Sequence, residues 1–231
     1  GSVSFLYKVL GIGTQQLSQR KIGESLSLLG PIGNHFKPSR DIPLLIGGGV
    51  GIPPMIFLAE SLTQSEHSTS PFVIMGSEVP FPFTPIKSKQ PIVGIDKKTN
   101  AAMPLLEEWG IANRLTSKSI VNKRENLQES AGYFDGYVTE LAELWLEALS
   151  PEQLEQVEIF SCGPHAMLSA VSDLANNYNI PCQVSLEEFM ACAVGGCAGC
   201  VVEVATPQGP AMKRVCVDGP IFDSRLVFNN E

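Results

Sequence analysis

The stretch LLIGGGVGIPPM, residues 44–55, indicates how the centre of this chain folds. A short apolar run ahead of glycines is typical of a strand that is buried on both faces of a parallel sheet. Apolar residues at helical spacing follow, and Pro53 and Pro54 suit the first turn of that helix. A strand, a glycine turn and a helix N-terminus form a site for phosphate, because free N–H groups and the helix dipole favour an anion.

Three glycines of this turn are candidates for binding a nicotinamide nucleotide. Gly48, Gly49 and Gly51 would let a pyrophosphate approach the backbone closely. The alternative is that these glycines serve only to pack the helix on the sheet. A strand FVIMGS (72–77) follows, and its continuation Glu78 would lie near the 2′ position of the bound nucleotide. A carboxylate there repels a phosphate and accepts from a ribose hydroxyl, which favours NAD over NADP.

A second turn of the same kind begins at Cys162, in VEIFSCGP (157–164). It ends a buried strand and opens a helix. Ligands of an open α/β sheet lie at the carboxyl ends of the strands, so Cys162 is expected to face the same crevice as Gly49. Cys162 is the candidate catalytic residue, and Gly163 and Pro164 are candidate cofactor-binding residues. The alternative for Cys162 is a small residue at a tight turn, and His165 is expected to be helix surface.

Buried strands alternate with helices from residue 41 to residue 186, which indicates a doubly wound parallel sheet. Further strands are expected at PIVGI (91–95), NRLTSKS (113–119) and PCQVSL (181–186). Helices are expected at 103–110, 138–149 and 165–178, with a loop at 122–132.

The first forty residues read differently. Residues 3–10 alternate in polarity, which predicts a half-buried strand, and GIGT (11–14) would turn the chain. LSLLG (26–30) predicts another short strand. This segment is expected to be the C-terminal part of a small β-barrel, which forty residues alone would leave unclosed.

Four of the six cysteines are grouped near the C-terminus, at Cys192, Cys197, Cys200 and Cys216. Their spacing, C-x4-C-x2-C and then a distant fourth cysteine, is that of plant-type 2Fe–2S ferredoxins. Two irons bridged by sulfides need two thiolates each, and the small residues of AVGGCAG let backbone N–H groups approach the sulfurs. A zinc site and buried free thiols are the alternatives. A hairpin is expected in GCVVEVATPQGPAMKRVCV (199–217).

Composition excludes several classes of protein. The chain has 231 residues and a net charge of −8, so neither nucleic acid nor an anionic membrane surface is an expected partner. No apolar run reaches the roughly 18 residues of a membrane-spanning helix. The N-terminal sequence does not resemble a secretory signal, so a cytoplasmic protein with reduced thiols is expected rather than a disulfide framework.

Several motifs together resemble one family. GGGVGIPPM, CGPHAM, SLEEFMAC-x4-C-x2-C and VCVDGPIF occur in the order seen in electron-transfer subunits of NAD-dependent dihydroorotate dehydrogenases, within the ferredoxin reductase superfamily. FLYKVLGIGTQQLS and LLGPIGNHF are similar to the second half of that family's flavin domain. The resemblance implies a flavin barrel at 1–40, an NAD-binding Rossmann-like domain at 41–186 and a 2Fe–2S domain at 187–231.

The resemblance also implies a role and partners. A separate catalytic subunit would carry FMN and oxidise dihydroorotate in pyrimidine biosynthesis, within a heterotetramer. Electrons would pass through the 2Fe–2S cluster and FAD to NAD. By match, FAD would contact Leu6, Tyr7, Lys8, Gly13 and Thr14, and the four cysteines would hold the cluster. Alternatives are a stand-alone ferredoxin-type reductase with another partner and a non-catalytic iron–sulfur module.

The chain departs from the family pattern at three points. An Arg-Pro-x-Ser stretch expected upstream of FLYKV is absent from these 231 residues, so FAD is expected to bind weakly or not at all. Ala193 stands where the family usually has glycine, and Phe189 stands where arginine is usual. These two differences concern the surroundings of the cluster and the interface with the partner.

Overall fold

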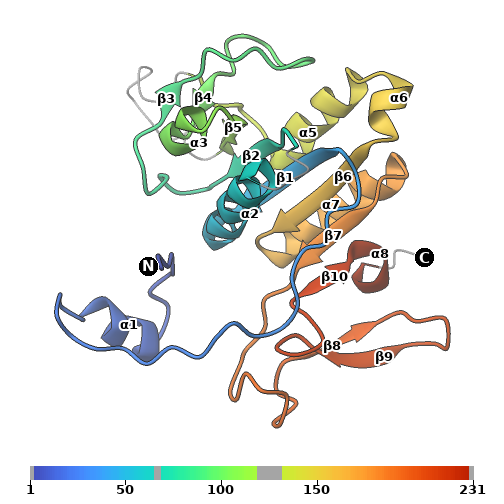
Figure 1. Ribbon diagram of the computed structural model, residues 1–231. Helices are drawn as coiled ribbons and strands as arrows, with labels where there is room; N and C mark the ends of the chain where they lie inside the picture. The colour runs from blue at the N-terminus through green and yellow to red at the C-terminus, as the bar shows by residue number, and fades with distance from the viewer. Residues whose placement is uncertain (1–2, 65–68, 119–131, 229–231) are drawn as a thin grey trace.

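The computed structural model describes residues 3–64, 69–118 and 132–228 and is built around one six-stranded sheet (Figure 1). The strand order is β10-β7-β6-β1-β2-β5. All neighbouring pairs are parallel except β10 with β7. The strands span β1 Ile42–Gly48, β2 Phe72–Gly76, β5 Ala112–Thr116, β6 Val157–Cys162, β7 Cys182–Ser185 and β10 Ile221–Asp223. The predicted parallel α/β sheet is confirmed.

Helices cover both faces of the sheet, because successive side chains of each strand point to opposite sides. On one face, Leu45 of β1 packs with Met55 and Ala59 of helix α2 (Ile52–Gln64). On the other, Leu44 of β1 belongs to a core with Trp145 of α5 (Val138–Glu147). The same face carries α7 (His165–Asn177). Shorter helices are α3 (Pro104–Glu108), α6 (Pro151–Leu154) and α8 (Ser224–Val227).

The strand order creates a crevice beside β1. From β1 the chain moves outward to β2 and β5 on one side, then returns to β6 and β7 on the other. The connections that leave β1 and β6 therefore run to opposite faces, and the carboxyl ends of these two strands lie side by side. Such a switch point is where open α/β sheets bind their ligands.

Between β2 and β5, two details of the structure differ from expectation. Residues 91–95 form turns instead of a strand, because Gly94 has φ +74° and Ile95 N–H bonds back to the Ile92 carbonyl at 3.2 Å. Ile92 and Ile95 still pack against the core, so their apolar character reflects burial without a strand. A two-stranded sheet of β3 (Ile86–Lys87) and β4 (Ala101–Ala102) was not predicted. Of the expected loop at 122–132, residues 122–131 lie outside the described residues.

The strands expected at 3–10 and 26–30 are wrong: within residues 3–40 the structure has no strand and no part of a barrel. GIGT begins the helix α1 (Ile12–Ser18) instead of a turn, with Gln15 N–H bonded to the Gly11 carbonyl at 2.9 Å. Strands need neighbouring strands for their hydrogen bonds, and this segment has none beside it. Its alternating apolar side chains stay in solvent, with Val3 73% and Phe5 65% exposed.

Residues 33–40 tie this segment to the rest of the molecule. Asn34 Nδ2 donates to the carbonyl of Ile221 at 2.8 Å, and Asn34 Oδ1 accepts from Ile221 N–H at 2.8 Å. Further along, the buried carboxylate of Glu158 accepts from the N–H and hydroxyl of Ser39, at 2.8 and 3.1 Å. The chain therefore enters β1 after crossing both the C-terminal unit and β6.

The C-terminal unit contains the predicted hairpin, β8 (Val201–Val204) paired with β9 (Ala211–Arg214). It also supplies β10, which extends the central sheet beyond β7 and was not expected. Cys200, Val215 and Cys216 belong to the same buried core as α5 and α7. The unit is thus continuous with the sheet, and the boundaries proposed at residues 41 and 187 stay predictions.

Candidate functional site

The structure brings the two predicted turns together at the crevice. A Cβ on Gly51 would overlap the carbonyl group of Cys162 and lie 2.7 Å from the nitrogen of Gly163. A Cβ on Gly48 or on Gly163 would lie 2.5 Å from the side chain of Met167. Gly51 therefore leaves no room for a side chain, because its neighbours are backbone, whereas at Gly48 and Gly163 the close neighbour is the flexible end of Met167.

Gly49 differs from its neighbours. It has φ +55°, and a Cβ there would meet nothing within 4 Å. Its backbone therefore borders open space at the carboxyl end of β1. The helix α2 starts at Ile52, and because Pro53 and Pro54 have no N–H, an anion would be bound through the amides that precede them.

The thiol of Cys162 lies half-buried at the end of β6. Burial is the main cause that raises its pKa, a hydrogen bond with Ser185 lowers it, and the charge of Glu187 raises it further. Cys162 is therefore protonated at neutral pH and is a poor nucleophile. It can contact a ligand in the crevice without placing a negative charge there.

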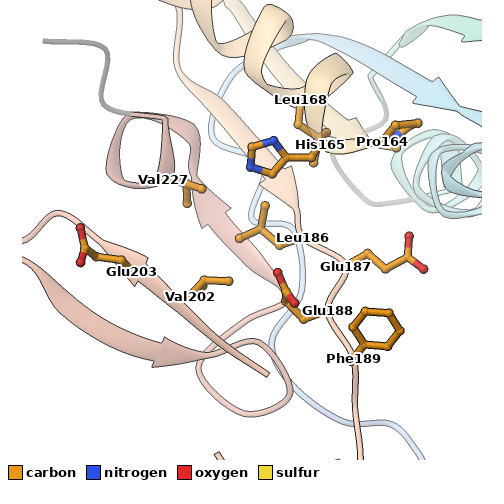
Figure 2. A pocket seen from close by; sticks show the side chains of 11 residues that line it. Pro164, His165, Leu168, Leu186, Glu187, Glu188, Phe189, Val202, Glu203 and Val227 are labelled. Atoms are coloured by element: carbon orange, nitrogen blue, oxygen red, sulfur yellow. The ribbon is translucent and has the colours of Figure 1, made fainter. Parts of the chain in front are cut away.

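A cavity of about 610 Å³ opens beside the second turn (Figure 2). Gly163, Pro164 and His165 line it from the start of α7, and Glu187, Glu188 and Phe189 line it from the segment after β7. The hairpin and α8 complete the wall with Val202, Glu203 and Val227. The cavity thus lies between the central sheet and the cysteine-bearing unit. His165 was expected to be helix surface. It borders the cavity because the N-terminus of α7 lies beside the C-terminal end of β7, where Cys162 pairs with Ser185.

The four clustered cysteines lie near one another in two pairs. Cys197 N–H donates to the Cys192 sulfur at 3.4 Å, and the Cys192 thiol also interacts with the Cys197 thiol. Cys216 makes a side-chain hydrogen bond with Cys200, and both are buried. Among residues 3–64, 69–118 and 132–228, no three metal-binding side chains are close enough to hold a single ion.

The loop backbone favours thiolates. Ala193, Gly195 and Ala198 have φ of 57°, 80° and 54°, which turns successive N–H groups toward the sulfurs. The N–H groups of Val194 and Cys197 are the main causes that lower the pKa of Cys192 to about 6. Most Cys192 side chains are therefore thiolates at neutral pH.

The second pair is different, because burial and then the neighbouring Cys200 thiol raise the pKa of Cys216. A guanidinium lies near this pair. Asp218, first by hydrogen bond and then by charge, raises the pKa of Arg214, and the sulfurs of Cys216 and Cys200 add to this. The Arg214 guanidinium is therefore held in its charged form beside the turn that carries Cys216.

An apolar rim surrounds the cysteine loop. Cys197 is exposed, and so are Phe189 at 93% and Val194 at 63%. Met190 and Val217 are also exposed. Phe189 is one of the two residues that depart from the family pattern, and it is among the side chains that line the cavity (Figure 2).

The five residues matched to FAD contacts are not assembled into a site. Leu6, Tyr7, Lys8 and Gly13 are exposed, and Thr14 is bonded within its own turn to the amides of Leu10 and Gly11. Gly13 and Thr14 belong to α1 and the other three precede it, on a segment that stands apart from the central sheet (Figure 1). No helix in the described part of the chain has the length and apolar character needed to cross a bilayer.

Comparison with known proteins agrees with these features. The family model for the iron-sulfur cluster binding domain of dihydroorotate dehydrogenase B matches residues 187–228. The dihydroorotate dehydrogenase B (NAD(+)) electron transfer subunit of Caldanaerobacter subterraneus subsp. tengcongensis is 32% identical over 95% of this chain and 73% of its own length. The probable counterpart from Methanocaldococcus jannaschii is 30% identical over 99% of this chain and 73% of its own length.

A solved structure shares the fold. The NADH-dependent reduced ferredoxin-NADP oxidoreductase, solved in work on flavin-based electron bifurcation, matches with a TM-score of 0.69 at 25% identity. The match covers 96% of this chain and 67% of the other. The matched iron-sulfur domain and these relatives show that the chain belongs to the family of electron transfer subunits of NAD(+)-dependent dihydroorotate dehydrogenase B.

Proposed function

We propose that this chain passes electrons between a partner that oxidises dihydroorotate, in pyrimidine biosynthesis, and NAD, through a 2Fe–2S cluster and FAD. The observation that carries the proposal is the pairing of four thiols from the 192–200 loop and the turn after β9, Cys192 with Cys197 and Cys200 with Cys216. A two-iron cluster takes two thiolates on each iron, and the two pairs supply them. The cluster would contribute one-electron transfer.

The crevice beside β1 is the proposed NAD site. Gly49 borders open space there, and the amides before Ile52 can bind a pyrophosphate. Gly163 and Pro164 lie across the crevice and line the neighbouring cavity. Cys162, as a neutral thiol, would orient the nicotinamide ring by contact without repelling a hydride donor. Glu78 is exposed just beyond β2, which favours NAD over NADP.

FAD is proposed to contact the segment that carries Leu6, Tyr7, Lys8, Gly13 and Thr14. Here these residues are exposed and no strand holds them. We therefore expect the 231-residue chain to bind FAD weakly, since ordering such a segment opposes binding.

The partner is proposed to be an FMN-containing catalytic subunit in a heterotetramer, docked on the apolar rim of Phe189, Met190, Val194 and Val217. A rim of this kind, with the exposed Cys197 inside it, would bring the partner's cofactor near the cluster. Four thiols that must stay reduced favour the cytoplasm.

A second candidate is a reductase that serves a different partner, such as a ferredoxin. The likeness to the NADH-dependent oxidoreductase at a TM-score of 0.69 favours it. That enzyme shares this chain's fold over most of its length, so the fold alone does not choose between the two.

The test is co-expression of this chain with an FMN-containing dihydroorotate dehydrogenase subunit, followed by anaerobic cluster reconstitution and addition of FAD. Formation of a stable complex and dihydroorotate-driven appearance of NADH at 340 nm would support the proposal. A chain that loads its cluster and reduces ferredoxin with NADH, but forms no complex and gives no dihydroorotate-dependent turnover, would refute it in favour of the second candidate.

A further inference from the structure

One side chain joins the two segments that carry the cysteines. The carbonyl of Arg214, at the end of β9, accepts from the N–H groups of Asp218 at 2.8 Å and Val217 at 3.2 Å, which closes the turn around Cys216. The Nη1 of the Arg214 side chain reaches the 192–200 loop and donates to the carbonyl of Gly195 at 3.1 Å. Arg214 therefore connects the Cys216 turn with the 192–200 loop.

Asp218 fixes the direction of this guanidinium. Its Oδ2 accepts from the Arg214 backbone N–H at 2.8 Å and from Arg214 Nε at 3.2 Å. With Nε bound on one side and Nη1 on the other, the planar fork has little freedom to turn. The cation is thus held between the turn that carries Cys216 and the 192–200 loop, although its own side chain is 42% exposed.

The contact with Gly195 also sets the direction of amides in the loop. With its carbonyl bound to Arg214, Gly195 has φ +80°, and its N–H faces the Cys216 sulfur while that of Gly196 faces Cys192. A Cβ on Gly195 would lie 3.1 Å from the Val217 side chain, so both this contact and the positive φ favour glycine here. Hydrogen bonds to ligand sulfurs are among the determinants of an iron–sulfur potential.

Given the two-iron cluster of the proposed function, we propose that Arg214 is a positioning residue that sets the reduction potential of the cluster, opposed by Asp218. Reduction adds one negative charge to the cluster. A fixed cation and aligned N–H groups stabilise that charge and raise the potential, and a nearby carboxylate lowers it. The two members of this ion pair should therefore shift the potential in opposite directions.

The test is a redox titration of the reconstituted 231-residue chain, followed by electron paramagnetic resonance of the reduced cluster. Arg214→Gln should lower the equilibrium constant for cluster reduction about tenfold, which is about 59 mV for one electron. Asp218→Asn keeps an oxygen that can accept from the Arg214 amide but removes the charge, so it should shift the potential upward. Arg225→Gln is the matched control, because Arg225 is bonded to Asn176 and Asn179 at the far end of α7.

Equal potentials in the wild-type, R214Q and D218N proteins would overturn the proposal, and so would shifts of the same sign in both variants. If R214Q loads no cluster, its loss supports the positioning role, and R214K together with D218N then decides the role of charge. R214K, which keeps the positive charge, should then load a cluster whose potential lies near that of the wild type, and a downward shift in D218N would contradict the proposal. Failure of the wild-type chain to assemble any iron–sulfur cluster would instead refute the proposed function.

Discussion

Two glycine-to-alanine variants should separate the role of the glycine turn in packing from its role in ligand binding. Gly51→Ala should reduce stability, and Gly49→Ala should mainly reduce NADH affinity. In Gly51→Ala the new Cβ overlaps the carbonyl group of Cys162 and lies 2.7 Å from Gly163 N. Both neighbours are backbone, so the turn after β6 must move by about 1 Å to restore ordinary contact. Overpacking of this kind costs about 3 kcal/mol.

Gly49→Ala should behave differently. Its Cβ meets nothing within 4 Å, and only the backbone at φ +55° opposes the change, by roughly 1 kcal/mol. The methyl group would, however, stand where a pyrophosphate approaches the backbone. We expect NADH affinity to fall at least tenfold, which is about 1.4 kcal/mol.

The assays are urea unfolding followed by circular dichroism and NADH titration by calorimetry on the full chain. With a urea m-value of about 3 kcal/mol/M, the midpoint should fall by about 1 M in Gly51→Ala and by about 0.3 M in Gly49→Ala. Wild-type NADH affinity in Gly49→Ala would show that the glycine turn only packs the helix. An unchanged midpoint in Gly51→Ala would show that the reasoning from close approach is wrong.

Three further predictions concern single residues. In metal-free protein, iodoacetamide should label Cys192 first, at a rate that rises through about pH 6 as its thiolate forms. Cys182 should be labelled last, because burial raises its pKa to about 12. Peptide mapping that finds Cys182 labelled early would contradict this. Glu78→Ser should raise the efficiency with NADPH relative to NADH roughly tenfold, or about 1.4 kcal/mol, and an unchanged ratio would show that Glu78 does not face the ribose. Ala193→Gly should stabilise the metal-free loop by up to about 1 kcal/mol, since Ala193 has φ 57°; slower protease cleavage of the loop would show it, and faster cleavage would argue against strain.

The central sheet was predictable because its signals are local. Leu44, Leu45 and Ile46 are fully buried on both faces of β1, and such a run bounded by glycines has few other interpretations. The crevice was also predictable, because the carboxyl ends of adjacent parallel strands meet at one edge. The spacing of the cysteines predicts a two-iron site, which stays a prediction, and the structure adds that the four thiols lie in two pairs.

Features set by distant contacts were not predictable. Ile92 and Ile95 look like part of a strand, yet they lie in a turn beside α5, half-buried against the core. Gly94 between them is too close to Leu144 and Ala148 for a side chain. The pairing of β10 with β7 joins residues far apart in the chain. The alternating polarity near the N-terminus is typical of a strand. No strand forms there because no other strand within the described residues lies beside this segment.

The central claim is that Cys192, Cys197, Cys200 and Cys216 hold a two-iron cluster. The direct measurement is iron and acid-labile sulfide content, with the visible spectrum, of the anaerobically reconstituted chain, alongside Cys197→Ser and, as a matched control outside the loop, Cys162→Ser. About two irons and two sulfides per chain are expected for the wild type and for Cys162→Ser, with loss of the brown colour in Cys197→Ser. A stoichiometric zinc content without sulfide, or full cluster occupancy in Cys197→Ser, would contradict the account.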